Sequence, residues 1–495
     1  MSTCTTHTAS QAPVAARTSV RRPAGLVTLA ALISLGIATS SMPAWAVTIE
    51  EVVQKAVDSH PEVGAIRANR RAINQELRAA RGAYLPSVDL SASWGHEWVN
   101  SPSSRTRAGR INGESGWVDM NRYELGVNLR QLVFDGFGTD FEVKRQKGRV
   151  SSARWRVMDT AQAIGLRAIE AFLEVQRTRR IVAISQRNVR IHRAILGRVA
   201  ARARGGRGPR SDVDQARARL ASANASLATA RSNLGDAKAL YVQAIGVEPG
   251  ALQKTAAPAS ALPANIDAAV ATARAEAPSV LARAADVRSA RAAVGVARSR
   301  FMPTVNIELS GSVSRGVNTS STSLFRETKE FTALLVGRWN IYRGGIDTAR
   351  KRESVARLHE ARDRLNVTRR EVAQQTTNSW NALTAARFRL VALRRQLSAN
   401  RRVRLAYSRQ FDRGQRTLLD LVDIQNEIFN NETAVTTEAF TIKFGAYRTL
   451  ATMGKLLSTL NIRLPIEAIR RPSRGLAHGL GRRIKRASLF KKKSK

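Results

Sequence analysis

The mature part of this sequence has no cysteine. The only cysteine, Cys4, precedes an apolar run over residues 24–37 and the segment Ala44-Trp45-Ala46, which has the small-x-small pattern of a secretory cleavage site. Three arginines and no acid lie ahead of the apolar run. We therefore predict a signal peptide over residues 1–46, whose removal excludes disulfides, cysteine metal sites and a lipid anchor on an N-terminal cysteine.

Long apolar runs are also absent. A membrane-spanning helix needs about 20 consecutive apolar residues, and the run 24–37 is too short and too rich in small residues to serve as an anchor. No later stretch reaches even about 18 apolar residues, so the sequence predicts no transmembrane helix in the mature chain.

Acidic residues are scarce. The chain has 38 Asp and Glu against 81 Lys and Arg, a formal charge of +43, or +40 without the three arginines of the signal peptide. Such an excess is typical of polyanion binding, but export argues against nucleic acid. Residues 470–495 hold eleven basic residues and no acid, which predicts a disordered, solvated tail, with contact to an anionic surface or partner as the alternative.

Proline is missing between residues 102 and 209 and again between residues 303 and 465. Because an interior proline breaks a helix at a cost of about 3 kcal/mol, these windows favour long helices, which we place at 137–203 and 345–410. At 1.5 Å per residue each would be roughly 100 Å long. Each ends at a glycine-containing turn, so the sequence predicts two antiparallel helical hairpins.

A helix of this length must bury an apolar stripe against another helix. The second long window contains two sets of apolar residues at intervals of seven: Leu358, Leu365 and Val372, and Leu383, Leu390 and Leu397. This spacing is typical of a coiled coil, with a shift between the two sets.

What the sequence does contain is one segment twice. Two pairs of prolines, each pair 25 residues apart, mark the copies: Pro61 and Pro86, and Pro278 and Pro303. Asp212 lies six positions after Gly206, and Asp420 lies six positions after Gly414. The copies are offset by about 210 residues, so a duplication builds almost the whole mature protein.

The duplication predicts the division of the chain. We expect a first repeat over residues 47–246, an equatorial linker over 247–266, a second repeat over 267–460 and a basic, disordered tail over 461–495. Each repeat is expected to contain a helix, two strands, a long helix and a returning helix, with hairpin tips near 205–212 and 412–420.

Between the shorter and the longer helix of each repeat the hydrophobic period changes to two. The alternating apolar residues define four strands: Val88, Leu90, Ala92 and Trp94; Tyr123, Leu125, Val127 and Leu129; Val305, Ile307, Leu309 and Val313; and, less regularly, Phe331, Ala333, Leu335 and Trp339. Such strands suit either a half-buried soluble sheet or an outer-membrane barrel. Aromatic residues at the strand ends favour the barrel, and since four strands cannot close one, several chains must assemble.

The second hairpin tip carries the most specific motif. The segment Phe411-Asp412-Arg413-Gly414-Gln415-Arg416-Thr417-Leu418-Leu419-Asp420-Leu421-Val422-Asp423 resembles the tip motif of the TolC family of outer-membrane channel proteins, and the segment from Gly206 to Asp212 is its degenerate partner. The resemblance covers about residues 49–460. The stretches 60–63, 75–88 and 129–139 look most like the branch of this family that serves type I protein secretion.

This resemblance implies a mainly α fold with a membrane β-barrel: a homotrimer whose twelve strands form a barrel in the outer membrane, continued by a periplasmic α-helical coiled-coil barrel. It implies an exit duct for secreted proteins that works with an inner-membrane ABC transporter and a periplasmic adaptor, without a cofactor. The alternative within transport is drug or metal efflux. A periplasmic scaffold that binds anionic polymer is a further alternative, but it leaves the amphipathic strands unused.

Nothing in the sequence indicates an enzyme. No Walker sequence occurs, and the six histidines are scattered without the spacing of metal ligands. We therefore expect passage of substrate without bond chemistry.

Function is expected to concentrate at the tips. Asp420 and Asp423 lie three apart on one helical face, so three chains would form two carboxylate rings that attract cations; the alternative is that both simply favour the start of a helix. By resemblance, Arg416 would donate to Ser211 and Asp212 of the other hairpin; the alternative is an exposed arginine of the turn.

Two further features of the tips lead to expectations. Phe411 stands where many members of the family carry tyrosine, so one closing hydrogen bond is missing. We expect easier opening, or closure that relies more on Arg416. Gly206 and Gly414 are expected to permit positive backbone angles in the two tip turns.

Overall fold

The computed structural model describes residues 46–100, 117–206, 208–315 and 327–469. The predicted signal peptide, apart from Ala46, and the basic segment 470–495 lie outside the described residues. The first half contains α1 (Ile49–Ser59), α2 (Pro61–Gly82), β1 (Ser87–Val99), β2 (Val118–Phe134), α4 (Gly138–Arg204) and α5 (Arg210–Ile245). The second half contains η1 (Ala259–Ala261), α6 (Ile266–Glu276), α7 (Pro278–Ser299), β3 (Thr304–Arg315), β4 (Thr328–Arg338), α8 (Ile346–Asp412), α9 (Leu418–Thr452), α10 (Leu456–Thr459) and α11 (Ile466–Ile469).

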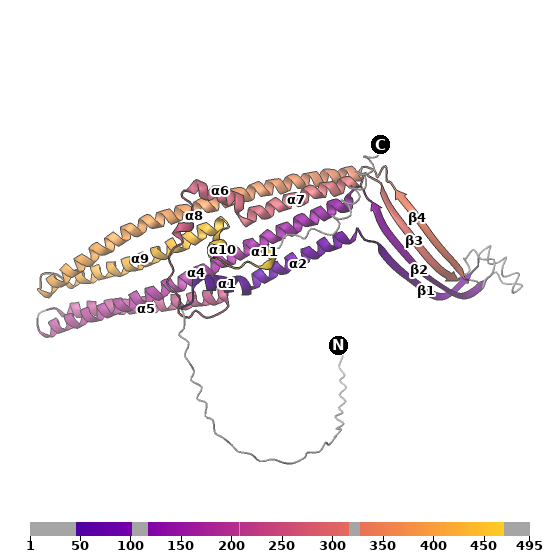
Figure 1. Ribbon diagram of the computed structural model, residues 1–495. Coiled ribbons are helices and arrows are strands. Elements are labelled where there is room, and N and C mark those ends of the chain that lie inside the picture. Colours follow the sequence, from indigo (N-terminus) through magenta and orange to yellow (C-terminus); the bar gives the residue numbers. More distant parts are fainter. Residues whose placement is uncertain (1–45, 101–116, 207, 316–326, 470–495) are drawn as a thin grey trace, which may run out of the picture. The chain divides into compact units, whose positions relative to one another are not determined.

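The two halves repeat one sequence of elements (Figure 1). Helices α1 and α6 each have 11 residues, α2 and α7 each have 22, and α4 and α8 each have 67. The returning helices α5 and α9 have 36 and 35. The duplication of helix, strand pair, long helix and returning helix is confirmed.

The four repeat-defining prolines lie at corresponding element boundaries. Pro61 and Pro278 are the first residues of α2 and α7, where the fixed φ of proline suits a helix and its missing N–H removes no intrahelical bond. Pro86 and Pro303 directly precede β1 and β3. Proline therefore stops one helix and starts the next element at the same point of each repeat.

Each long helix packs along its partners through seven-residue repeats. Helix α4 contacts α2, α5, α7 and α9, and α8 contacts α6, α7 and α9. On α5 the alanines at 216, 223, 230 and 237 are buried, and on α8 the predicted leucines at 383, 390 and 397 are buried. The small alanine side chains let α5 lie close to α4, and both patterns are those of coiled-coil seams. No helix of the described segments is both long and apolar enough to cross a bilayer.

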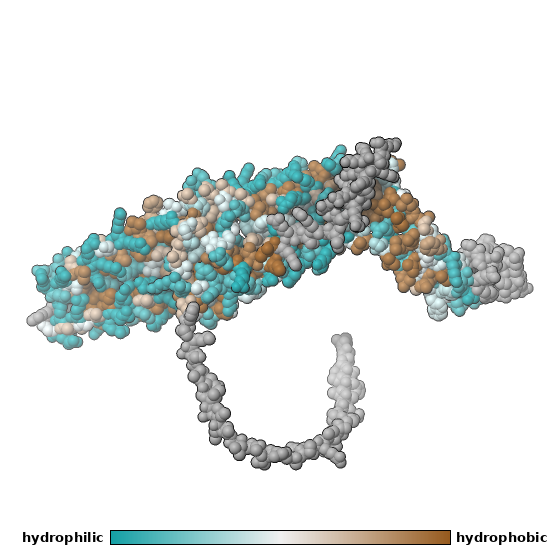
Figure 2. All heavy atoms as spheres, viewed as in Figure 1, coloured by the Kyte–Doolittle hydropathy of each residue, from teal (hydrophilic) through white to brown (hydrophobic). Residues whose placement is uncertain are grey.

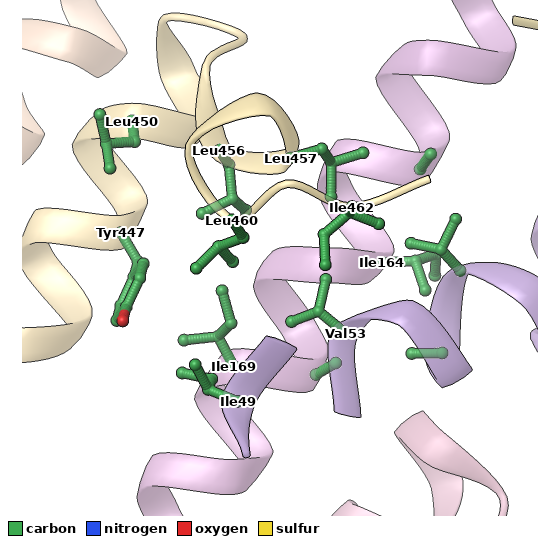
Figure 3. Close-up of a cluster of buried hydrophobic side chains, with 14 of the residues drawn as sticks. Ile49, Val53, Ile164, Ile169, Tyr447, Leu450, Leu456, Leu457, Leu460 and Ile462 are labelled. Atoms are coloured by element: carbon green, nitrogen blue, oxygen red, sulfur yellow. The ribbon is translucent and has the colours of Figure 1, made fainter. Parts of the chain in front are cut away.

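The main apolar core lies midway along the helices, where α1, α4, α9 and the segment after α9 meet (Figure 3). Ile49 and Val53 of α1 face Ile164 and Ile169 of α4, and Leu457 closes the cluster from α10. These side chains are almost fully buried. The core therefore fixes the middle of both long hairpins to the shorter helices.

One predicted boundary is wrong. The tail was expected to be disordered from residue 461, but residues 461–469 are folded and include α11. Ile462 belongs to the main core, and the buried Glu467 pairs with Arg67 of α2, with 2.9 Å between Nε and Oε2. The sequence-based boundary was drawn too early because residues 470–495 are strongly basic, and residues 461–469 were grouped with them although they are mostly apolar and contain Glu467.

The four strands form one antiparallel sheet in the order β1-β2-β3-β4. Its register brings the alternating apolar residues to a common face: Leu90 lies opposite Val127, Leu129 opposite Leu309, and Ile307 opposite Leu335. This face is open, with Leu90 71% and Leu335 72% exposed, and Figure 2 shows apolar residues gathered over the sheet. The other face is largely polar, although Leu334 and Val336 of β4 lie on it.

Candidate functional site at the hairpin tips

The two hairpin turns of the chain lie at the same end of the helices (Figure 1). Gly206, between α4 and α5, has φ +70°, and Gly414, between α8 and α9, has φ +79°. Glycine adopts this region without a steric penalty, so both turns can reverse the chain tightly.

A small apolar cluster joins the two tips. Its members come from all four helices of the hairpins: Ile195, Val199, Ala216, Phe411, Leu418, Leu421 and Val422. Phe411 is only 4% exposed and Val422 is fully buried. Within one chain, the first hairpin is therefore packed against the second at the tip.

Two arginines of α4 hold the last turn of α8. The Nη1 of Arg202 donates to the carbonyl oxygen of Phe411 at 2.7 Å, and its guanidinium lies over the Phe411 ring, 4.7 Å from the centroid. One turn earlier, Arg198 Nη1 donates to Ser408 Oγ at 3.3 Å and to Asp412 Oδ1 at 3.4 Å. The Phe411 carbonyl also accepts from Gly414 N at 3.0 Å, and Arg202 is its second donor. Cations near the last carbonyls of a helix are favoured by the helix dipole.

Arg416 binds its own hairpin. Its Nε donates to Gln410 Oε1 at 3.1 Å, its Nη1 lies 3.6 Å from Asp420 Oδ2, and its guanidinium covers the Tyr407 ring at 4.6 Å. Arg416 and Asp212 line one pocket of about 220 Å³ between the turns, together with Arg202 and Phe411. Ser211 lies in the first turn of α5. The hydrogen bonds from Arg416 to Ser211 and Asp212 stay a prediction.

Asp420 is held at the start of α9. Thr417, the N-cap, accepts from the backbone N of Asp420 at 3.3 Å and donates to its Oδ2 at 2.8 Å. These bonds, together with the nearby Arg416, hold the pKa of the Asp420 carboxyl below its ordinary value, so it is ionised at neutral pH.

Asp423 lies one turn further along α9. Its Oδ1 is 3.5 Å from Arg219 Nη2 on α5, and both side chains are partly exposed. The two aspartates thus share one face of α9, and each has an arginine beside it. The carboxylate rings expected from three chains stay a prediction.

Arg198, Arg202 and Arg219 were not predicted from the sequence. Each lies in a helix that carries many arginines, so neither spacing nor composition distinguishes these three, which cross between the hairpins near the tip. Phe411, by contrast, was identified from the motif, and the structure adds that its ring and carbonyl both contact Arg202. Among the described residues, no group of three or more His, Cys, Asp or Glu side chains is placed to hold a metal ion.

The profile of the family described as "Outer membrane efflux protein" matches residues 52–247 and 269–437, which cover both repeats. Outer membrane efflux protein BepC of Brucella suis is 27% identical over 431 residues, 87% of this chain and 90% of BepC. Outer membrane protein TolC of Vibrio cholerae is 21% identical over 409 residues, 80% of this chain and 88% of that protein.

Solved structures agree on the fold. The Campylobacter jejuni CmeC outer membrane channel superposes with a TM-score of 0.70, covering 82% of this chain and 86% of CmeC at 15% sequence identity. At this identity the likeness concerns the fold, a trimeric barrel continued by a helical coiled-coil barrel, which is the class predicted from the sequence.

Proposed function

We propose, from the premise that the chain belongs to the outer membrane efflux protein family, that it is the outer-membrane exit duct of a type I system that secretes proteins. Membership itself makes the chain a channel rather than an enzyme, located in the outer membrane with a long periplasmic helical extension. The type I assignment rests on the segments 60–63, 75–88 and 129–139, which resemble that branch.

The sheet supports a channel made by several copies. One face is apolar and open, and β1 and β4 have no strand neighbour on their outer side among the described residues. Unpaired strand edges pair with other strands when these are available, and twelve strands from three copies make an even-numbered barrel of ordinary size. We therefore propose a homotrimer with its apolar face toward lipid.

We propose that the tips close this duct. In each chain Arg202 and Arg198 fasten the end of α8 to α4. Arg416 would exchange its contacts with Gln410 and Asp420 for Ser211 or Asp212 of a hairpin beside it. Three copies of Asp420 and Asp423 would form the carboxylate rings. Docking of a periplasmic adaptor and an inner-membrane ABC transporter at the tips is part of the same proposal.

The test is a deletion strain complemented with the wild-type gene. Type I secretion predicts that a large protein disappears from the medium or cell surface after deletion and returns on complementation. A vector without the gene is the control. If all secreted proteins persist in the deletion strain, the proposal is wrong.

Efflux of drugs or metals is the second candidate, because the matched relative BepC is described as an efflux protein. It predicts unchanged secretion together with raised sensitivity to toxic compounds, restored by complementation. The same two strains therefore distinguish the candidates.

A further inference from the structure

A pocket lined by several arginines lies at the other end of the helices, where they join the sheet. It measures about 700 Å³ and is lined by the ends of α2 and α7, the start of α4 and the segment that leaves β4. Three arginines line it: Arg300 after α7, Arg338 at the end of β4 and Arg343 before α8. All three are exposed.

The two acidic residues that line this pocket, Asp135 and Glu142, already accept hydrogen bonds from other residues. Asp135 Oδ2 accepts from the backbone N and the Oγ1 of Thr139 at 2.6 and 2.7 Å. Glu142 is bound by both the Nε and the Nη2 of Arg145, at 2.7 Å each. These two carboxylates therefore have donors of their own, and the pocket keeps an excess of positive charge.

The arginines keep donors for a further partner. Arg338 Nη1 lies 3.7 Å from Glu308 Oε1, and Arg343 Nε lies 3.9 Å from Asp347 Oδ2, both longer than the 2.7–2.9 Å of a good charged hydrogen bond. With the Asn340 amide oriented to satisfy its neighbours, Arg343 Nε also donates to its oxygen at 2.9 Å, so the Nε side of this guanidinium is engaged. The Nη atoms of Arg343 and the guanidinium of Arg300 retain donors for an anion, and a phosphate group has the geometry that matches such forks.

The surroundings identify where such an anion would come from. The apolar face of the sheet continues into Trp339, Ile341 and Tyr342, which are 63%, 85% and 82% exposed. Trp339 Nε1 donates to the carbonyl of Phe301 at 3.1 Å, so the aromatic segment is fixed against the end of α7. Exposed Trp and Tyr at the edge of an apolar band mark the level of lipid headgroups.

We propose that this pocket binds the phosphate of an anionic phospholipid in the membrane leaflet that faces the periplasm. The acyl chains would cover the apolar face of the sheet beside Trp339, while Arg300 and Arg343 bind the headgroup phosphate; Arg338 lies on the polar face of the sheet, beside Glu308. Basic clusters next to a membrane-spanning segment attract anionic lipid in this way. The bound lipid would secure the junction between the sheet and the helices.

The experiment uses the full-length protein in detergent with added phosphatidylglycerol or phosphatidylcholine, and native mass spectrometry counts the lipids retained. Wild type is expected to retain phosphatidylglycerol in preference. R300Q/R343Q is expected to retain it about tenfold less for each arginine lost, since each loses charged hydrogen bonds to phosphate. R300K/R343K, which keeps the charge, is expected to retain part of it.

Two controls make the result decisive. R369Q/R370Q removes two exposed arginines of α8 that do not line the pocket, and it should behave as wild type. Glycerol phosphate added in excess tests for a soluble ligand. Equal retention of both lipids by wild type, undiminished retention by R300Q/R343Q, or full displacement by glycerol phosphate would each overturn the proposal. An unboiled gel checks that each variant still assembles.

Discussion

Arg202 joins two hairpins with a single side chain, because its guanidinium donates to the Phe411 carbonyl and covers the Phe411 ring. A charged hydrogen bond and a cation–π contact together contribute about 2 kcal/mol, or about 30-fold in an equilibrium. We expect Arg202→Ala to shift the tip toward the open form by roughly that factor, raising single-channel conductance in planar bilayers.

Arg202→Lys is the matched variant for this prediction. Lysine keeps the charge and one donor but lacks the planar fork, so an intermediate conductance is expected. Unchanged conductance in Arg202→Ala would show that Arg202 does not hold the tip closed. Arg204→Ala is the control, since this exposed residue of the same turn does not line the pocket between the tips.

The two aspartates of α9 lead to a prediction about cations. If three chains bring Asp420 and Asp423 into rings, trivalent cations should block the channel from the tip side. The double variant Asp420→Ala with Asp423→Ala should conduct normally and lose this block. Conductance with and without the cation measures it, and block that persists in the double variant would contradict the rings.

His192 gives a prediction about pH. It is 2% exposed on α4, and its burial, followed by the nearby Arg219, lowers its pKa from 6.5. As the pH decreases below 6.5, His192 is protonated more readily in the unfolded chain than in the folded chain. The free energy of unfolding therefore decreases as the pH is lowered. At higher pH the residue is neutral in both states and this effect is absent.

The His192 effect is measured as the difference between wild type and His192→Gln in thermal unfolding across about pH 8 to about pH 5. The wild type should lose more stability on acidification than the variant, because only wild type has the buried imidazole to protonate. Parallel curves for the two proteins would contradict the assignment.

At the level of elements, the two faces of the sheet predict opposite responses to a charge. Val127 and Asn128 are neighbours on β2, but Val127 lies on the apolar face and Asn128 on the polar face. Arginine on a lipid-facing position costs about 2–4 kcal/mol near the middle of the bilayer. We expect Val127→Arg to destabilise the assembled protein by that order and Asn128→Arg to change its stability little.

Urea unfolding in lipid vesicles compares the two variants directly. Because they carry the same charge one residue apart, general effects of an added arginine cancel. Equal destabilisation by both would mean that Val127 does not face lipid.

Much of the element pattern follows from the sequence, for identifiable reasons. The windows without proline allow the long helices α4 and α8, and the helix-forming composition between glycine-containing segments places their ends to within a residue or two. The alternation places the four strands, but β2 begins at Val118, earlier than the alternating residues from Tyr123 indicate. Its first residues gain their strand conformation from pairing with β1, which is a tertiary effect.

The tip contacts could not be predicted in the same way. Phe411, Arg416 and the aspartates stand out because they form a motif, whereas Arg202 depends on how two helices of different repeats pack together. Leu334 and Val336 on the polar face of β4 were likewise not expected, and no feature of the described residues explains them.

At the level of the whole molecule, the equal lengths of α4 and α8 bring the two tips to the same height. Deleting seven residues from both α4 and α5 would withdraw one tip by about 10 Å and break the cluster around Phe411. We expect this variant to conduct as a constantly open channel in planar bilayers.

A second variant carries the same deletion in α8 and α9 in addition to the first. It tests whether the matched height of the two tips is what closes the channel. Shortening both hairpins equally restores the register of the tips, so closure should return although the duct is shorter. If the doubly shortened protein also stays open, the contact between tips does not control conductance.

The two outer strands β1 and β4 have a consequence for biogenesis. Before it assembles, an exported chain exposes both edge strands and the apolar face of its sheet. Each can associate with an unrelated protein as well as with another copy of the chain. Aggregation therefore competes with trimer assembly during the time between export and association with two other copies. Because trimer assembly depends on the concentration of unassembled chains, slower synthesis should lower the yield of assembled channel more than proportionally.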